Sequence, residues 1–126
     1  PASRPVPPLL PLLRAGVVVA AGSDGVRDTW GPYGNADMLE RAMLLGLRNN
    51  LRRDDELAQV LEVCTTGGAR MLGLADHGLH AGAAADLVLV EAETIADAIV
   101  SRPARRLVIK AGRVVAEDGT PVFQVA

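Results

Sequence analysis

The sequence has few residues of the types that bind metals or act as nucleophiles. Among its 126 residues there is one cysteine, and there are two histidines. A single cysteine, Cys64, excludes a disulfide within the chain and is typical of proteins in a reducing cytoplasm. A catalytic zinc or iron site usually has three protein ligands. The chain therefore has few of the cysteine and histidine ligands that a complete metal site of its own would need.

Aromatic residues and excess charge are also scarce. Tryptophan, tyrosine and phenylalanine occur once each, so the core must consist of alanine, leucine and valine. The 13 basic residues nearly balance the 15 acidic ones, and the net charge is −2. That balance gives no electrostatic basis for binding nucleic acid or a membrane surface. No apolar run reaches the roughly 18 residues that a transmembrane helix requires. The sequence therefore predicts neither nucleic acid nor membrane as a partner.

The chain is short for an enzyme of the α/β class. It can form one modest domain, but a complete (β/α)8 barrel takes about 250 residues. Its first residues, Pro1-Ala2-Ser3-Arg4-Pro5, are neither an initiator sequence nor a signal peptide. We therefore expect a fragment of a larger protein or one subunit of a split enzyme.

What the sequence does contain is a strongly apolar run that ends at a carboxylate. Residues 16–21 are Gly-Val-Val-Val-Ala-Ala, and Asp24 follows closely. A short apolar run bounded by glycine is typical of a parallel strand buried on both faces, so we predict such a strand over 17–21. Asp24 would then lie at its carboxyl end, where α/β folds place functional groups. Residues 22–35 form a long loop, and loops of this length are often functional.

The rest of the chain predicts helices followed by strands. Four of the helices begin at proline, aspartate or threonine, and the helix over 36–48 is predicted from its broad apolar face. They are expected at residues 7–16, 36–48, 54–64, 65–73 and 94–101. Strands are expected at 86–90, 105–110, 113–117 and 122–125, with a hairpin turn at Ala111-Gly112. The break between the two parts falls near residues 76–85.

Four stretches resemble the amidohydrolase superfamily, in particular its cytosine deaminase-like branch, which also holds s-triazine aminohydrolases. They correspond to the last barrel strand with its loop, the start of the next helix, a helix of the pattern T-x-x-A-A-R-x-L-G-L, and the return into a small β-sandwich. In this sequence they are residues 22–34, 34–40, 65–74 and 82–90, the last continued by 110–115. They occur in the family's order and cover residues 6–119.

The resemblance implies an α/β fold made of the C-terminal portion of a (β/α)8 TIM-like barrel plus strands of a small β-sandwich domain. Residues 1–76 would be the last βα units of the barrel. Residues 77–126 would be the return segment of the sandwich, with one helix.

The resemblance also implies roles for residues in the loop. In these enzymes the aspartate that matches Asp24 binds a divalent metal, zinc or iron, and accepts a proton from the metal's water. Trp30 matches a rim position where an aromatic face can cover a flat ring. Gly25 stands where cytosine deaminases carry a second acidic residue facing the pyrimidine, so its lack of a side chain favours a triazine or another ring. We expect Asp28 to hold the loop in an Asx turn.

Plainer interpretations stand beside these. By position alone Asp24 could equally cap the turn after the strand, and Trp30 could pack the loop onto the barrel. His77 and His80 are interpreted as structural or solvated, because no acidic or cysteine partner lies at ligand spacing. Cys64 lies on an apolar helix face and is interpreted as a core thiol rather than a nucleophile. The family's metal-binding histidines and its proton-shuttling glutamate are absent from this sequence.

These observations predict that the parent protein is a metal-dependent amidohydrolase that deaminates a cyclic substrate such as cytosine or a related pyrimidine or triazine. It would hydrolyse a non-peptide C–N bond, and its substrate would be a small cyclic amine or amide. The isolated chain would be inactive, because the N-terminal part of the enzyme, or another chain, must supply the remaining metal ligands.

Three alternatives remain open at this point. One is an s-triazine aminohydrolase, another is a dihydropyrimidinase-like enzyme, and the third is a non-catalytic structural or interaction remnant. In the third case the strand at 17–21 would need another chain or a second copy of this chain to cover it, which makes a homo-oligomer a further option.

Overall fold

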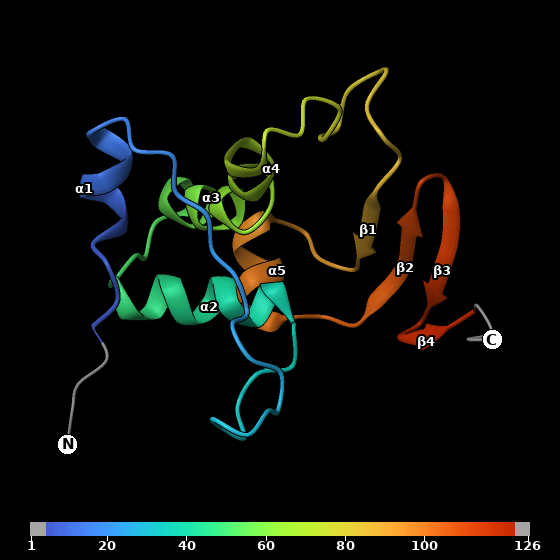
Figure 1. The fold of residues 1–126 in the computed structure, drawn as a ribbon, viewed down its shortest axis with the longest axis horizontal. Coiled ribbons are helices and arrows are strands. Elements are labelled where there is room, and N and C mark those ends of the chain that lie inside the picture. Colours follow the sequence, from blue (N-terminus) through green and yellow to red (C-terminus); the bar gives the residue numbers. More distant parts are fainter. Residues whose placement is uncertain (1–4, 123–126) are drawn as a thin grey trace.

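The computed structural model describes residues 5–122 and consists of a group of helices beside an antiparallel sheet. In Figure 1 the helices lie on one side and the strands on the other, and the loop before α2 projects away from both. The helices are α1 (Leu9–Arg14), α2 (Met38–Arg48), α3 (Asp54–Val63), α4 (Thr66–Leu72) and α5 (Ile95–Ser101). The strands are β1 (Leu87–Val90), β2 (Arg105–Lys110), β3 (Arg113–Glu117) and β4 (Thr120–Pro121). The predicted mixture of helices and strands is confirmed.

Two of the helices, α2 and α5, begin where a polar side chain satisfies free backbone N–H groups. The Asp37 carboxylate accepts hydrogen bonds from the N–H groups of Leu39 and Glu40, at 2.9 and 3.1 Å, and starts α2. At α5 the Thr94 hydroxyl accepts from the Asp97 N–H at 3.0 Å. These caps explain why the expected helix positions agree with the observed ones within a few residues. Among residues 5–122 no helix is long and apolar enough to cross a membrane.

The core lies between the helices. Its buried residues come from α1, α2, α3 and α5 and are small or aliphatic, as the scarcity of aromatic residues requires. They are Leu9, Ala42, Val60, Val63 and Ile99. Helices α2 and α3 approach closely at Gly46, where an added Cβ would lie 3.3 Å from a Leu57 methyl group. The helices are thus held by close packing of small side chains.

The four strands form one sheet in the order β1-β2-β3-β4, with every neighbouring pair antiparallel. The predicted hairpin of β2 and β3 is confirmed, and its turn at Ala111-Gly112 has positive φ at both residues, 49° and 76°, as a type I′ turn requires. The short β4 pairs with β3. Of the strand expected over 122–125, residues 123–125 lie outside the described residues.

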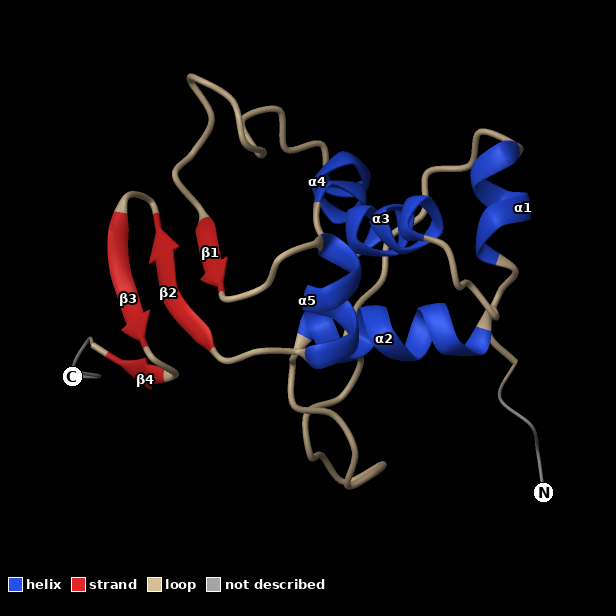
Figure 2. Ribbon diagram, turned by 180° about the vertical axis from the view of Figure 1, so that it is seen from behind, coloured by secondary structure: helices blue, strands red, loops and turns tan. Residues whose placement is uncertain are grey.

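Helix α5 connects β1 to β2 and joins the sheet to the helices. It packs against α2 and α3, as the view from behind in Figure 2 shows. A second connection is an ion pair between Arg105, in β2, and Asp37, the residue that caps α2. The sheet is therefore attached to the helices through α5 and through the start of α2.

The strand predicted over 17–21 is wrong. These residues are extended but belong to no strand, and Val17 and Val18 are 47% and 52% exposed rather than buried. Two bonds attach the segment to the helices, from the Val17 N–H to Leu12 and from the Ala21 N–H to Val63. A strand needs a neighbouring strand for its backbone groups, and no other part of the described chain lies beside this segment as one.

Candidate functional site

A polar cavity of about 330 Å³ lies where the extended segment 17–21 gives way to the site loop, which we define as residues 22–36. All but one of its lining residues belong to this loop. They are Ser23, Asp24, Gly25, Asp28, Trp30, Gly31, Tyr33 and Gly34, with Arg41 from α2. The residues singled out from the sequence, Asp24, Gly25 and Trp30, are thus brought together around one cavity.

Asp24 has a carboxylate that nothing else in the described chain engages. Within residues 5–122 it takes part in no hydrogen bond and no ion pair. Its backbone has φ of 58°, in the left-handed region, which aspartate tolerates better than most residues. The carboxylate is therefore an unengaged acceptor in a polar cavity, which is what a metal ligand or a proton acceptor needs.

Asp28 organises the tip of the site loop. Its Oδ1 accepts hydrogen bonds from the N–H groups of Trp30, at 2.9 Å, and Gly31, at 3.2 Å. The backbone forms a bridge between Asp28 and Gly31, and the Arg27 N–H donates to the Tyr33 carbonyl at 3.4 Å. The expected Asx turn is confirmed, and it folds the loop back on itself.

Trp30 and Tyr33 present their rings at the surface. Trp30 is 95% exposed and Tyr33 is 85% exposed. Large aromatic side chains are seldom so free of contacts. In the described chain the indole does not pack the loop onto the helices, and its face is open to a ligand or to protein outside this chain.

The space beside Gly25 is occupied. A Cβ added to Gly25 would lie 1.8 Å from Oδ2 of Asp28. The sequence suggested that the space beside Gly25 was left empty. In the structure the carboxylate of Asp28 fills that space. Gly25 lines the cavity, and its contact with a substrate stays a prediction.

Two buried polar atoms beside the cavity lack partners within residues 5–122. They are the Ser23 hydroxyl oxygen and Nε of Arg41. Buried polar groups are nearly always hydrogen-bonded, because leaving one unpaired costs about 1–3 kcal/mol. Sequence reasoning missed both residues, since Ser23 only precedes the acidic residue and Arg41 reaches the cavity from a helix. Their unused groups point to a partner that this chain does not contain.

The residues present fit a metal ion only in part. No group of three or more histidine, cysteine or acidic residues comes together in residues 5–122. One oxygen of Asp28 is already used by the loop backbone, which leaves Asp24 as the free carboxylate. A transition metal at this cavity could take Asp24 as one ligand, and at least two more would have to come from elsewhere in the protein.

The remaining reactive side chains lie away from the cavity. His77 and His80 are not among its lining residues, and the His80 Nδ1 lies 3.2 Å from the Ala81 carbonyl. Cys64 is half-buried, and burial raises the pKa of its thiol to about 11. A thiol with this pKa stays protonated at neutral pH and is a poor nucleophile. These findings agree with the structural interpretations made from the sequence.

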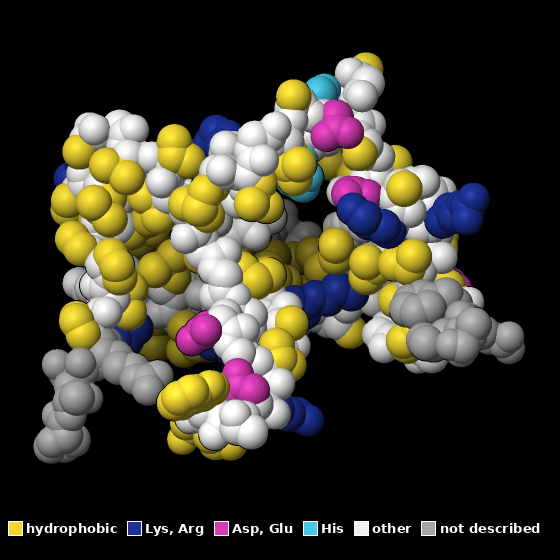
Figure 3. Space-filling model, in the orientation of Figure 1, with side chains coloured by type: hydrophobic (Ala, Val, Ile, Leu, Met, Phe, Trp, Pro, Cys, Tyr) yellow, Lys and Arg dark blue, Asp and Glu magenta, His cyan; other side chains and the backbone are white. Residues whose placement is uncertain are grey.

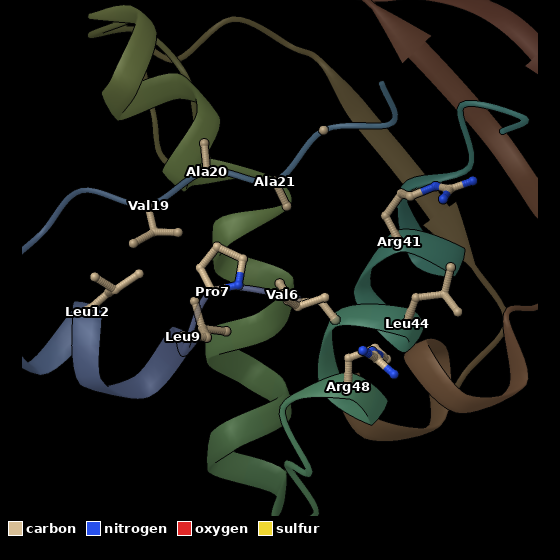
Figure 4. Close-up of a pocket in the computed structure, with 12 residues that line it drawn as sticks. Val6, Pro7, Leu9, Leu12, Val19, Ala20, Ala21, Arg41, Leu44 and Arg48 are labelled. Carbon is tan, nitrogen blue, oxygen red and sulfur yellow. The ribbon is translucent and has the colours of Figure 1, made fainter. Parts of the chain in front are cut away.

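A second, apolar groove of about 460 Å³ runs between α1, the extended segment and α2. Val19, Ala20 and Ala21 form one wall, and Leu9 and Leu44 contribute from the helices, as Figure 4 shows. Figure 3 shows that apolar side chains cover much of the molecular face around α1. Arg41 lines both the groove and the polar cavity. The groove therefore exposes apolar surface of the kind that is usually buried in a protein interior.

Comparisons with known proteins find relatives that match most of this chain. Residues 1–116 match the model of the amidohydrolase family. The chain is 36% identical over 115 residues to N-isopropylammelide isopropyl amidohydrolase of Pseudomonas sp. (strain ADP), covering 90% of this chain and 28% of the relative.

Solved structures of related enzymes also superimpose on most of this chain. N-isopropylammelide isopropylaminohydrolase from Burkholderia multivorans ATCC 17616 superimposes with a TM-score of 0.91 at 56% identity, over 97% of this chain and 31% of that one. The 5-methylcytosine deaminase of Klebsiella pneumoniae, liganded with 5-fluorocytosine, does so with a TM-score of 0.81 at 28% identity, over 96% of this chain and 29% of that one. The chain spans less than a third of the length of each of these relatives.

Proposed function

This chain belongs to the amidohydrolase family, and on that premise we propose that it is the C-terminal part of a metal-dependent enzyme that hydrolyses the bond between an s-triazine ring and an exocyclic amine. The observation that carries the proposal is the unengaged carboxylate of Asp24 in a polar cavity with Trp30 at its edge. The relatives at 36% and 56% identity are both named as hydrolases of N-isopropylammelide, which favours a triazine substrate.

In this proposal Asp24 has two tasks. Its carboxylate supplies one ligand to a divalent metal, and it accepts the proton of the attacking water. A divalent metal of the kind that this family generally uses lowers the pKa of water and polarises the bond under attack. Asp24 is suited to both tasks because no other described group competes for its oxygens.

Trp30 would bind the ring of the substrate. Its exposed indole offers a flat apolar face beside the cavity, and planar heterocycles stack on such faces. Gly25 lines the same cavity and gives the substrate room near the backbone. A pyrimidine is the second candidate substrate, favoured by the likeness to a deaminase bound to 5-fluorocytosine.

The rest of the enzyme would complete the barrel around residues 17–22. The N–H groups of residues 18–20 find no hydrogen-bond acceptor in the described chain, and Val17 and Val18 are about half exposed. The apolar groove beside them is open. We propose that barrel strands from the part of the enzyme outside this chain pair with this segment and also bring the missing metal ligands. The cytoplasmic location and a homo-oligomer remain predictions.

The test is a substitution of Asp24 in the full-length enzyme that contains this chain. We expect Asp24→Asn to lower kcat/KM by roughly 10²- to 10⁴-fold, the usual contribution of a general base, and to lower the bound metal measured by mass spectrometry. Asp76→Asn is the matched control, because Asp76 is an exposed aspartate outside the cavity. It should leave both quantities unchanged.

The substrate class is tested with the same enzyme. We expect turnover of N-alkylated ammelide to exceed that of cytosine, and we expect no turnover by the isolated chain with added zinc or iron. Full activity of Asp24→Asn would overturn the role of Asp24. Activity on cytosine alone would move the proposal to the pyrimidine branch, and no activity on either ring would favour a non-catalytic remnant.

A further inference from the structure

The geometry of the site loop points to Asp28 as a positioning residue: we propose that it holds Trp30 beside the cavity and that position 25 must be glycine for it to do so. The consequence for catalysis rests on the proposed function, because it concerns binding of the ring substrate. The positioning itself is a property of this chain and is testable without any activity.

Asp28 uses one carboxylate oxygen to fix the backbone at Trp30. Its Oδ1 accepts from two successive N–H groups, those of Trp30 and Gly31, at 2.9 and 3.2 Å. Hydrogen bonds from N–H groups to a carboxylate are about twice as strong as those between neutral groups. Since the Trp30 side chain is 95% exposed, these two bonds to the backbone are the described contacts that fix the position from which the indole projects.

Gly25 provides the room for this carboxylate. Its Cα is not in the left-handed region, so backbone conformation does not demand glycine there. The demand is one of space, because an added Cβ would lie 1.8 Å from Oδ2 and 2.7 Å from Cγ of Asp28. Real Cβ atoms do not approach other atoms so closely, so with alanine at position 25 the flexible end of the Asp28 side chain has to shift. We expect this shift to weaken its two hydrogen bonds to the loop backbone.

The two ends of the loop also meet at Gly25. A Cβ added to Gly34 would lie 2.0 Å from the Gly25 carbonyl oxygen, and Gly34 has φ of 97°. The two glycines thus allow the backbone at the two ends of the loop to come into contact. The loop is closed at this neck and braced by Asp28 at its tip, which leaves Trp30 little freedom in its backbone.

The first experiment uses the isolated chain, in which Trp30 is the single tryptophan. Time-resolved fluorescence anisotropy reports the local motion of its indole. We expect Asp28→Ala and Gly25→Ala each to increase the amplitude of the fast component, because they remove or weaken the two bonds to the loop backbone. Asp28→Asn keeps an acceptor oxygen and should retain most of the wild-type restriction.

Two variants serve as matched controls. Gly22→Ala adds a Cβ with nothing within 4 Å, so it is an equivalent substitution in the same loop without the clash. Thr94→Ala removes a side-chain cap of similar length from α5, away from the loop. Both should leave the anisotropy decay unchanged. Wild-type decays in Asp28→Ala and Gly25→Ala, or equal loosening by Asp28→Asn and Asp28→Ala, would overturn the proposal.

The second experiment measures KM and kcat in the full-length enzyme. We expect Asp28→Ala to raise KM about tenfold, with kcat and metal content within about twofold of wild type, because Trp30 contributes stacking rather than chemistry. A change in kcat with KM unchanged would contradict a positioning role. If the enzyme shows no activity on any ring, the proposed function fails while the anisotropy result still decides the role of Asp28.

Discussion

The two regions of this chain with the most strand-like sequences have opposite fates. Strands β1 to β4 pair with one another along the whole sheet, with registers such as Val88 opposite Val108. Residues 17–21 are more continuously apolar, yet they pair with nothing in the described chain and leave Val18 half exposed. A sheet built from neighbouring hairpins completes itself, whereas a parallel strand depends on partners far away in the sequence.

The comparison shows which parts of the described chain bury their own apolar residues and which part does not. The helices have their own buried core, centred on residues such as Val60 and Ile99, and the strands of the sheet pair with one another. The extended segment has the apolar sequence of a buried strand. In the described chain, however, part of it is exposed. Under the proposed function, this apolar surface would be the contact with the rest of the enzyme.

The largest expected effect is the difference in the free energy of unfolding between a substitution at a buried residue and one at an exposed residue. Ile99 is 1% exposed and Val18 is 52% exposed. Ile99→Ala should lower the free energy of unfolding of the isolated chain by about 2–5 kcal/mol, through lost transfer energy and a cavity. Val18→Ala should change it by less than about 0.5 kcal/mol.

Urea denaturation followed by circular dichroism measures both values. In the full-length enzyme Val18→Ala should become costly, by about 0.5–3 kcal/mol, because barrel strands then cover the side chain. A loss at Val18 in the isolated chain as large as that at Ile99 would show that the segment is already packed, and the comparison would fail.

A smaller effect tests how the extended segment rests on α4. A Cβ added to Gly67 would lie 2.5 Å from the Val19 carbonyl oxygen, whereas one added to Gly68 meets nothing within 4 Å. Gly67→Ala should therefore destabilise by about 1–3 kcal/mol, as overpacking usually does. Gly68→Ala, the adjacent control, should be neutral or slightly stabilising, because alanine favours a helix. Equal stabilities of the two variants would show that the segment moves aside freely.

The smallest effect concerns the sheet in acid. The pKa of Asp86 is lowered by its hydrogen bond and ion pair with Lys110 and by the Ala111 N–H, which donates at 2.8 Å. A lowered pKa means that this contribution to stability is present above the ordinary pKa of aspartate, about 4, and is lost as the pH falls through the folded-state value. Asp86→Asn should therefore remove part of the fall in melting temperature between pH 5 and 2. A full wild-type fall in the variant would exclude Asp86 as a source.

Much of the local structure could be predicted from the sequence, because its causes are local. The hairpin of β2 and β3 follows from two apolar runs around Ala111-Gly112, α2 follows from its broad apolar face, and α5 follows from the cap at Thr94. The error at 17–21 has a non-local cause. The residues were assigned to a strand for their apolar character, but pairing needs neighbours that the described chain does not contain.

The site divides in the same way. That Asp24 and Trp30 would share one cavity could be foreseen, because only six positions of a single loop separate them. The contact of Asp28 with Gly25 depends on the loop folding back at Gly34, which no pattern in the sequence shows. Arg41 reaches the cavity from a different element, and an arginine within a helix carries no sign of such a position.

The ion pair between Asp37 and Arg105 gives the sheet a part in the function of the loop. Asp37 follows the site loop directly, and its carboxylate holds the first turn of α2 as well as the arginine of β2. The last anchor of the loop that carries Asp24 and Trp30 is therefore shared between two parts of the fold. Removing the sheet, or exchanging it for that of a relative, would therefore also remove or change one of the contacts that hold the end of the site loop.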